Sequence, residues 1–197
     1  MFSSNLYKSF FILLFIIIFC FMAIMYSLYS VGSITISENG VLQSNTIIST
    51  SDFVWPVPSS KSITSYFGYR TAPTSGASTY HNGIDIAAPA GAELVAAFSG
   101  EITYIGFNGG NGYTIAISDG TYFAKYGHVS PYFLVYVGQY VNKGDVLATV
   151  GPKNVYGVPN NPYKDSSGNP TNGATTGPHL HFSLSKDGQA INPLNYF

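Results

Sequence analysis

Two histidines flank a single leucine in the run TTGPHLHFSLS near the end of the chain. Residues two apart on a β-strand point to the same face, so His179 and His181 would stand side by side, about 6.7 Å apart along the strand. Two imidazoles placed in this way can bind a metal ion or transfer protons. Taken alone, the pattern is equally that of a strand whose polar face happens to carry histidine.

The other two histidines of the chain are His81 and His128. Asp85 follows His81 by four positions in HNGIDIAAPAG, and an even spacing keeps both side chains on one face of an extended segment. Gly83 and the β-branched residues around it argue against a helix there. His81 and Asp85 are therefore predicted to bind one ion. His128 alone, in YGHVS, is more typical of a turn histidine than of a catalyst.

Two histidines and one carboxylate are a common ligand set for catalytic zinc, with a water molecule in the open fourth position. The metal lowers the pKa of that water to about 7 and polarises a carbonyl oxygen. Histidines left over beside the metal can take a proton from the water, stabilise the oxyanion and protonate the leaving amine. The same ligand set also describes the facial triad of non-haem Fe(II) enzymes, and this alternative stays open at this point.

Composition narrows the classes of protein to consider. The chain has 197 residues, a formal net charge of −1 and only 9% charged residues, so it has no basic face for phosphates and nucleic-acid binding is not expected. Its length suits one domain with an appendage. The single cysteine, Cys20, excludes an intrachain disulfide and a Cys₄ or Cys₂His₂ zinc site.

Short β-rich runs separated by turn signals indicate the elements that must position the histidines. The runs lie at 93–98, 101–106, 113–118, 121–126, 145–150 and 179–184. Glycine-rich and Asp-Gly turns separate the first four at hairpin-like distances. No helical period extends over ten residues, which predicts an all-β, antiparallel fold, either a β-sandwich or a partly open barrel.

One segment, 151–178, interrupts this rhythm with five prolines and five glycines. Such a composition permits neither a central strand nor a long helix. We expect a long loop that leads into the His179–His181 strand and forms a wall of the site.

The N-terminal part has a different character. Residues 10–29 carry no charge and are long enough to span a bilayer as a helix, which predicts one transmembrane anchor. By the positive-inside rule, Lys8 predicts that residues 1–9 lie in the cytoplasm and that everything after Ser30 lies outside it. Small residues at 30–33 offer a signal-peptidase site as the alternative, and cleavage there would give a secreted protein. A Ser/Thr/Asn-rich spacer, 30–52, then leads to the domain proper at 53–197.

Five motifs in order resemble the lysostaphin/LytM-type zinc metallopeptidases: ITSYFGYR, HNGIDIAAPAGAELVAAFSGEI, YGHVS, VGQYVNKGDVLATVG and TTGPHLHFSLS. The resemblance covers almost all of 53–197. It implies a β-sheet core called the duplicated hybrid motif and a Zn²⁺ endopeptidase that cuts peptide bonds of bacterial peptidoglycan. The stretch between LATVG and TTGPHLHF is longer than is usual in that family, which affects the expected substrate preference.

Residue by residue, the resemblance implies that His81, Asp85 and His181 bind one zinc ion per chain. It implies catalytic roles for His179 and His128, acting on the water and on the oxyanion. The expected partners are peptidoglycan peptides and the membrane, together with an envelope protein of unknown identity. The alternative function is that of a catalytically silent or gated relative that acts as a cell-wall binding, scaffold or activator module.

Overall fold

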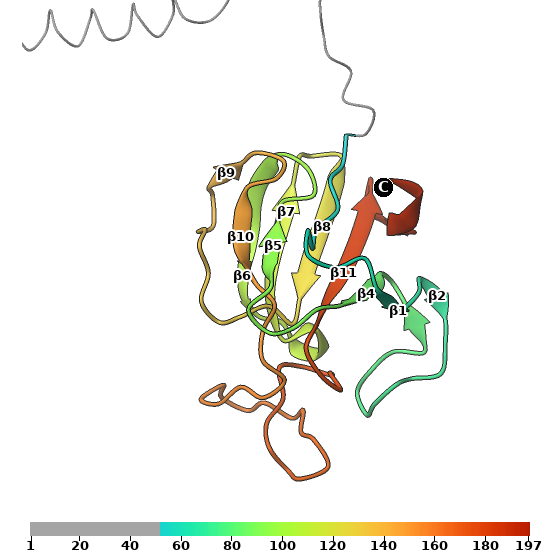
Figure 1. Ribbon diagram of the computed structural model, residues 1–197, viewed down its shortest axis with the longest axis vertical. Helices are drawn as coiled ribbons and strands as arrows, with labels where there is room; N and C mark the ends of the chain where they lie inside the picture. Colours follow the sequence, from blue (N-terminus) through green and yellow to red (C-terminus); the bar gives the residue numbers. More distant parts are fainter. Residues whose placement is uncertain (1–51) are drawn as a thin grey trace, which may run out of the picture. The chain divides into compact units, whose positions relative to one another are not determined.

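Short apolar runs that end at glycines or at Asp-Gly turns form the strands of this protein. The computed structural model describes residues 52–197, and these residues confirm the predicted all-β, antiparallel fold (Figure 1). The strands are β1 Ile63–Ser65, β2 Gly68–Tyr69, β3 Tyr80–His81, β4 Ile84–Ala87, β5 Glu93–Val95, β6 Gly100–Phe107, β7 Tyr113–Ser118, β8 Tyr122–Gly127, β9 Tyr140–Val141, β10 Val146–Thr149, β11 His179–Lys186 and β12 Gln189–Ile191. Two 3₁₀ turns, η1 Gly109–Asn111 and η2 Pro193–Asn195, are the helical elements of this part of the chain.

The large sheet has the order β1-β4-β11-β8-β7-β6-β9, and β12 pairs with β11. It does not close into a barrel, because this order runs from β1 at one edge to β9 at the other. Strand β11, which carries the HxH pair, lies between β4 and β8. The sheet therefore brings together three parts of the sequence that are far apart along the chain.

The β7–β8 turn illustrates how local sequence sets the pairing. The Asp119 carboxylate accepts hydrogen bonds from the backbone N–H groups of Thr121 and Tyr122, at 2.8 and 2.6 Å. Gly120, which lies between Asp119 and Thr121, adopts a left-handed backbone conformation with a φ of 94°. This turn directs β8 back along β7 and delivers Gly127 and His128 next to β11.

The expectation of a hairpin between 93–98 and 101–106 is wrong. Only Glu93–Val95 is a strand, and it pairs with β10 in a separate two-stranded sheet. Beyond Val95 the backbone groups find other partners: the Ala96 N–H donates to the Asp145 carbonyl, and the Ala97 N–H donates to the Tyr126 hydroxyl. A third small sheet consists of β2 and β3.

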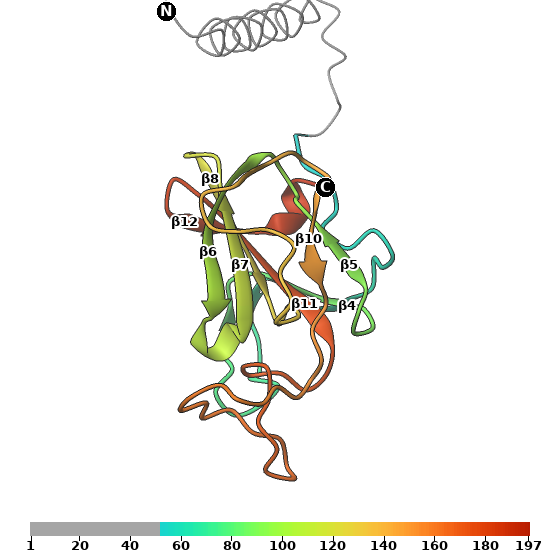
Figure 2. The same ribbon diagram turned by 90° about the vertical axis from the view of Figure 1, so that its left-hand side faces the viewer.

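The core lies between the large sheet and the two-stranded sheet of β5 and β10. Figure 2 shows these two sheets beside each other. Buried side chains of both sheets form one cluster, including Ile84, Ile86, Leu94, Ile102, Ile115, Ile117, Leu147, Leu180, Phe182 and Leu184. Leu180 therefore faces the core while its two histidine neighbours face away from it.

Between β10 and β11 the chain has neither strand nor helix, only isolated bridges: Val150 pairs with Val129, Asn154 with Thr171, and Lys164 with Pro170. Asp165 orders the outer part of this loop, because its carboxylate accepts hydrogen bonds from the backbone of Ser167 and Asn169.

Among residues 52–197, no helix has the length and hydropathy that a membrane span requires. The predicted anchor at 10–29, the N-terminal segment 1–9 and all but the last residue of the spacer lie outside the described residues.

Candidate metal centre and catalytic site

The register between β4 and β11 places His181 directly opposite Asp85. His181 Nδ1 lies 2.9 Å from Asp85 Oδ1, and both side chains are buried. Ala87, two residues along β4, faces His179 in the same way. Because side chains alternate along each strand, this single register delivers both histidines of the HxH pair to the face that carries Asp85.

His81 reaches the same point by a different route from the one the spacing suggested. The segment from His81 to Asp85 is not one extended strand, because the chain bends at Asn82 and Gly83 between β3 and β4. A Cβ on Gly83 would lie 2.4 Å from the Phe182 carbonyl oxygen, so only glycine fits at this bend. The bend brings His81 Nε2 to 3.1 Å from Asp85 Oδ1 and 2.9 Å from His181 Nδ1.

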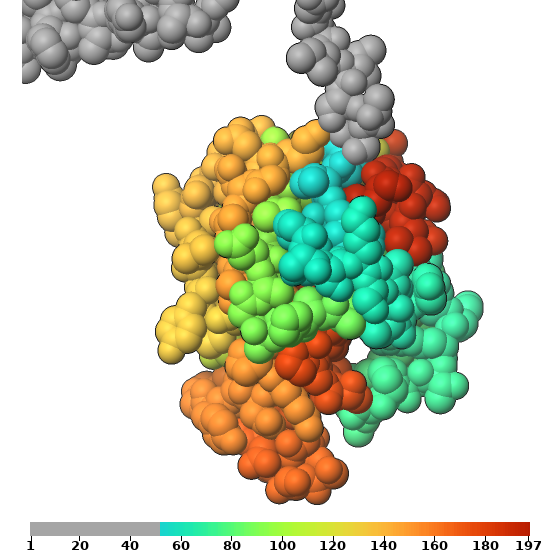
Figure 3. All heavy atoms as spheres, in the orientation of Figure 1, coloured from blue at the N-terminus to red at the C-terminus, as the bar shows by residue number. Residues whose placement is uncertain are grey.

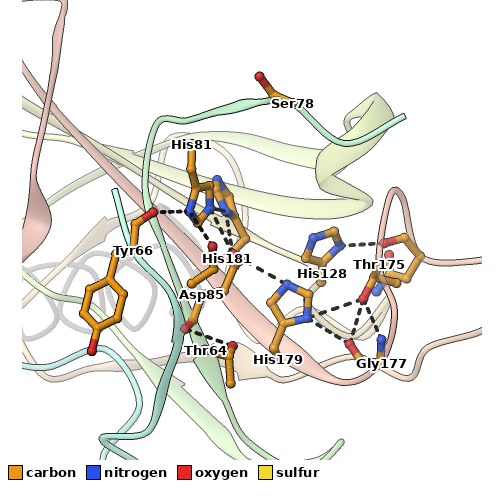
Figure 4. Close-up of polar contacts among 12 residues, drawn as sticks. Thr64, Tyr66, Ser78, His81, Asp85, His128, Thr175, Gly177, His179 and His181 are labelled. Carbon is orange, nitrogen blue, oxygen red and sulfur yellow. Dashed lines mark hydrogen bonds and ion pairs between the residues drawn. The ribbon is translucent and has the colours of Figure 1, made fainter. Parts of the chain in front are cut away.

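The side chains of His81, Asp85 and His181 point toward one another (Figure 4). His81 Nδ1 lies 2.9 Å from the Tyr66 carbonyl oxygen, which only accepts, so the ring proton is on Nδ1 and Nε2 presents its lone pair. The ligand atoms of His81, Asp85 and His181 all lie within 4.8 Å of one another. Two imidazole nitrogens and a carboxylate oxygen so close together fit a tetrahedral zinc ion with one open position.

Arg70, the single arginine of the chain, forms an ion pair with the second oxygen of the Asp85 carboxylate, Oδ2. Its Nη1 lies 2.9 Å from Asp85 Oδ2 and also donates to Ser65 Oγ. Burial by itself raises the pKa of Asp85, but the ring nitrogens of His181 and His81 close to its carboxylate lower the pKa by more, so the pKa lies well below its usual range. Asp85 is therefore present as a carboxylate at neutral pH.

The two remaining histidines lie beside these ligands. The rings of His128 and His179 have centroids 4.6 Å apart, and His179 Nε2 lies 3.6 Å from Asp85 Oδ1. Each ring points its Nδ1 at a backbone carbonyl, that of Gly177 for His179 at 2.8 Å and that of Asn172 for His128 at 2.6 Å. Because carbonyls only accept, both rings carry the proton on Nδ1 and present an unprotonated Nε2.

The imidazole ring of His128 is neutral. Burial lowers its pKa to about 3, and the nearby His179 and His181 lower it in the same direction. Its backbone has a φ of 57°, a conformation that non-glycine residues rarely adopt and that often marks functional sites.

An open cleft of about 720 Å³ contains all of these groups. One side is formed by residues of 64–80, including Arg70 and Ser78, and the other by the end of the long loop, including Ala174 and Pro178 (Figure 3). Of the segment 151–178, which was expected to form a wall of the site, only Ala174, Thr176, Gly177 and Pro178 line the cleft. A volume of this size suits a ligand of several residues or sugar rings.

The five residues singled out from the sequence therefore lie together: His81, Asp85 and His181 as one cluster, with His179 and His128 against it. Sequence reasoning assigned no role to Arg70 or Asn172. The signal for Arg70 was its uniqueness in a chain with few charges. No comparable signal marked Asn172, which lies among several asparagines of the long loop.

Comparison with known proteins gives a family match. The profile of peptidase family M23 matches residues 79–193, which contain all four histidines and Asp85. A DD-carboxypeptidase/endopeptidase, Mpg, of Neisseria meningitidis is 32% identical over 134 residues, which are 68% of this chain and 26% of the relative. The chain spans about a quarter of the length of the curated relatives it matches.

Solved structures agree with this match. A zinc-containing peptidase from Vibrio cholerae superposes with a TM-score of 0.56 at 27% identity, covering 72% of this chain and 39% of that one. The antimicrobial peptidase lysostaphin from Staphylococcus simulans superposes with a TM-score of 0.53 at 25% identity, covering 68% of this chain and 49% of that one.

Proposed function

Because the chain belongs to peptidase family M23, we propose that it is a zinc metalloendopeptidase that hydrolyses peptide bonds of bacterial peptidoglycan. The observation that carries the proposal is the convergence of His81 Nε2, Asp85 Oδ1 and His181 Nδ1 beside two further histidines. A scaffold module would not need three clustered metal-ligand groups together with two oriented histidines in one cleft.

In this proposal His81, Asp85 and His181 hold the ion. A zinc ion bound to these three ligands would lower the pKa of a water molecule and polarise the carbonyl of the scissile bond. Tyr66 fixes the ring of His81 through the hydrogen bond to its carbonyl oxygen. Arg70 holds the carboxylate of Asp85 by Oδ2 and leaves Oδ1 free to face the histidines.

His179 and His128 carry the proton transfers. Each presents an unprotonated Nε2, so either can accept the proton that water loses as it attacks the carbonyl carbon. Once protonated, the same nitrogen can donate a hydrogen bond to the developing oxyanion and then a proton to the leaving amine. His179 is the nearer of the two to the ligand cluster, at 3.6 Å from Asp85 Oδ1.

The names of the relatives and the shape of the cleft support the proposed substrate class. Relatives of this chain carry the names DD-carboxypeptidase/endopeptidase and peptidoglycan DD-endopeptidase. The cleft is open to solvent, and its volume of about 720 Å³ supports a peptide substrate of several residues. We further propose that residues 10–29 anchor the chain in the cell membrane with this domain outside the cytoplasm, which protease treatment of intact spheroplasts would test.

The decisive experiment uses the full-length chain, purified in mild detergent and loaded with zinc, and a His181→Ala variant as control. Each is incubated with peptidoglycan sacculi, and the released peptides are identified by mass spectrometry. New amino termini that the control does not produce support the proposal and identify the bond. Zinc bound at one ion per chain without new termini would instead favour a gated or silent relative that acts as a binding or scaffold module.

A further inference from the structure

Asn172 is a fully buried polar residue near the end of the long loop, and every polar group of it is bonded. Its side-chain Oδ1 accepts from the Tyr113 N–H at 2.8 Å, and its Nδ2 donates to the Val129 carbonyl at 3.0 Å. Its backbone N–H donates to the Lys153 carbonyl at 2.8 Å. Its backbone carbonyl is the group that accepts from His128 Nδ1.

Three glycines make room for this residue. A Cβ on Gly112 would lie 2.3 Å from both the carbonyl oxygen and Oδ1 of Asn172, and a Cβ on Gly151 would lie 2.6 Å from its Nδ2. Gly173, with a φ of 75°, passes so close to Gly112 that its own Cβ would lie 2.3 Å from the Gly112 nitrogen. Gly112 and Gly151 thus approach Asn172 from two sides, and Gly173 holds the next residue against Gly112, so Asn172 has little room to move.

The backbone of His128 is held equally firmly. Its N–H donates to the Asn111 carbonyl at 2.7 Å, and its carbonyl accepts from the Gly151 N–H at 2.9 Å. The amide of Asn172 contacts the chain just after His128, at Val129, and the start of the neighbouring strand, at Tyr113. With the backbone fixed in this way, the Asn172 carbonyl determines how the imidazole ring lies and which nitrogen carries its proton.

We propose that Asn172 is a positioning residue for His128: it fixes the ring in the tautomer with the proton on Nδ1, so that Nε2 is presented to the cleft. The inference rests on the proposed function in taking His128 as a proton-transfer group. Asn172 thereby makes the long loop part of the catalytic arrangement, although the side chain of Asn172 itself is sealed from the cleft by complete burial.

The first test is the tautomer itself. The full-length chain with four histidines, labelled with ¹⁵N-histidine and loaded with zinc, gives four pairs of ring nitrogen signals in long-range ¹H–¹⁵N spectra. A His128→Gln variant identifies the pair that belongs to His128. We expect a protonated Nδ1 and an unprotonated Nε2 for this ring. A protonated Nε2 in the wild-type protein would overturn the inference without any substitution of Asn172.

The second test removes the amide. In Asn172→Ala the Tyr113 N–H and the Val129 carbonyl lose their partners, so the carbonyl that orients His128 is released. We expect His128 to show a mixture of both tautomers, kcat to fall about tenfold or more, and KM and the zinc content to stay unchanged. Asn172→Asp keeps the volume and the Tyr113 bond but places an acceptor against the Val129 carbonyl, and it decides the question if the alanine variant does not fold.

Asn161→Ala is the matched control. Asn161 lies in the same loop, donates its Nδ2 to the Thr171 carbonyl at 2.8 Å and accepts from the Tyr163 N–H, but it does not contact His128. This variant should keep the wild-type tautomer and kcat. If kcat falls equally in the Asn161 and Asn172 variants, Asn172 only helps to order the loop, and the inference is overturned. Because the tautomer is read without substrate, an inactive protein with Nδ1-protonated His128 would refute the proposed function alone.

Discussion

Arg70 Nη1 lies 2.9 Å from Asp85 Oδ2, while Oδ1 of the same carboxylate faces three histidine nitrogens. The two oxygens of one buried side chain therefore have separate tasks. Arg70 balances part of the negative charge and fixes the plane of the carboxylate, so a single oxygen is directed at the ion. A carboxylate without this partner could rotate or bind through both oxygens.

Arg70→Gln should therefore weaken zinc binding by about 10- to 100-fold, the usual effect of removing a partner that orients a metal ligand. Zinc affinity is measured by competition with a chromophoric chelator. Lys153→Gln is the matched control, because it removes the cation of another ion pair, with Asp165 at 3.5 Å, away from the cleft. Unchanged zinc affinity in Arg70→Gln would mean that the histidines alone orient the carboxylate.

Zinc should also stabilise the fold. The three ligand atoms come from β3, β4 and β11, so an ion bound between them links strands that are distant in sequence. Zinc at 100 times its dissociation constant should add about 2.7 kcal/mol to the free energy of unfolding. Thermal unfolding with zinc and with EDTA measures the effect. The midpoint of His181→Ala should not respond to zinc, and an equal response in both proteins would place the ion elsewhere.

Local patterns predicted the parts of the site that depend on one strand. The alternation in HLHFSL is short-range, so it was enough to place His179 and His181 on one face and Leu180 on the other. The even spacing of His81 and Asp85 led to the correct neighbours by a wrong route, since the chain bends at Gly83. The bend depends on the close passage of Phe182, which is about a hundred residues away along the chain.

Contacts between distant segments account for what could not be predicted. Strand β5 pairs with β10, and the backbone beyond Val95 forms hydrogen bonds with Asp145 and Tyr126. No pattern within 93–98 indicates these distant partners. Asn172 resembles the other asparagines of its loop, and its role arises only where Gly112 and Gly151 surround it. A residue type that is rare in the chain, such as histidine, therefore indicates a functional role from the sequence alone. A common type such as asparagine does not, because its role depends on its tertiary contacts.

Strand β11, which carries His179 and His181 on one face, packs into the core through its other face, where Leu180 lies. Leu180 is fully buried between two histidines of the site, so Leu180→Ala should lower the free energy of unfolding by about 2–5 kcal/mol. Urea unfolding followed through Trp55, the single tryptophan, measures this change. The exposed Leu134 provides the control, since Leu134→Ala should change stability by less than about 0.5 kcal/mol. At low urea the Leu180→Ala variant should still bind zinc, because the zinc ligand His181 lies on the opposite face of β11 from Leu180. Loss of zinc binding by a folded variant would show that the two faces of the strand do not act separately.

Tyr126 gives a pH dependence whose sign can be derived. Its side chain is fully buried, and its hydroxyl accepts from the Ala97 N–H at 2.7 Å, the bond that replaces a strand partner beyond β5. Burial raises the pKa of Tyr126 above its ordinary value of about 10. In the unfolded chain this hydroxyl ionises above about pH 10, whereas in the folded protein it stays neutral. The stability that the buried neutral hydroxyl contributes is thus fully present below pH 10 and is lost as the pH rises above it.

Tyr126→Phe should separate the hydrogen bond from the titration. At pH 8 the variant should be less stable by about 1–3 kcal/mol, because the buried Ala97 N–H loses its acceptor. Above pH 10 the gap should narrow, since only the wild-type chain gains from ionisation at this position when it unfolds. Urea unfolding at pH 8, 10 and 11 measures both effects, and Tyr132→Phe, at an 82% exposed residue, should match the wild type throughout. A gap that is constant with pH would mean that the hydroxyl ionises equally easily in the folded protein.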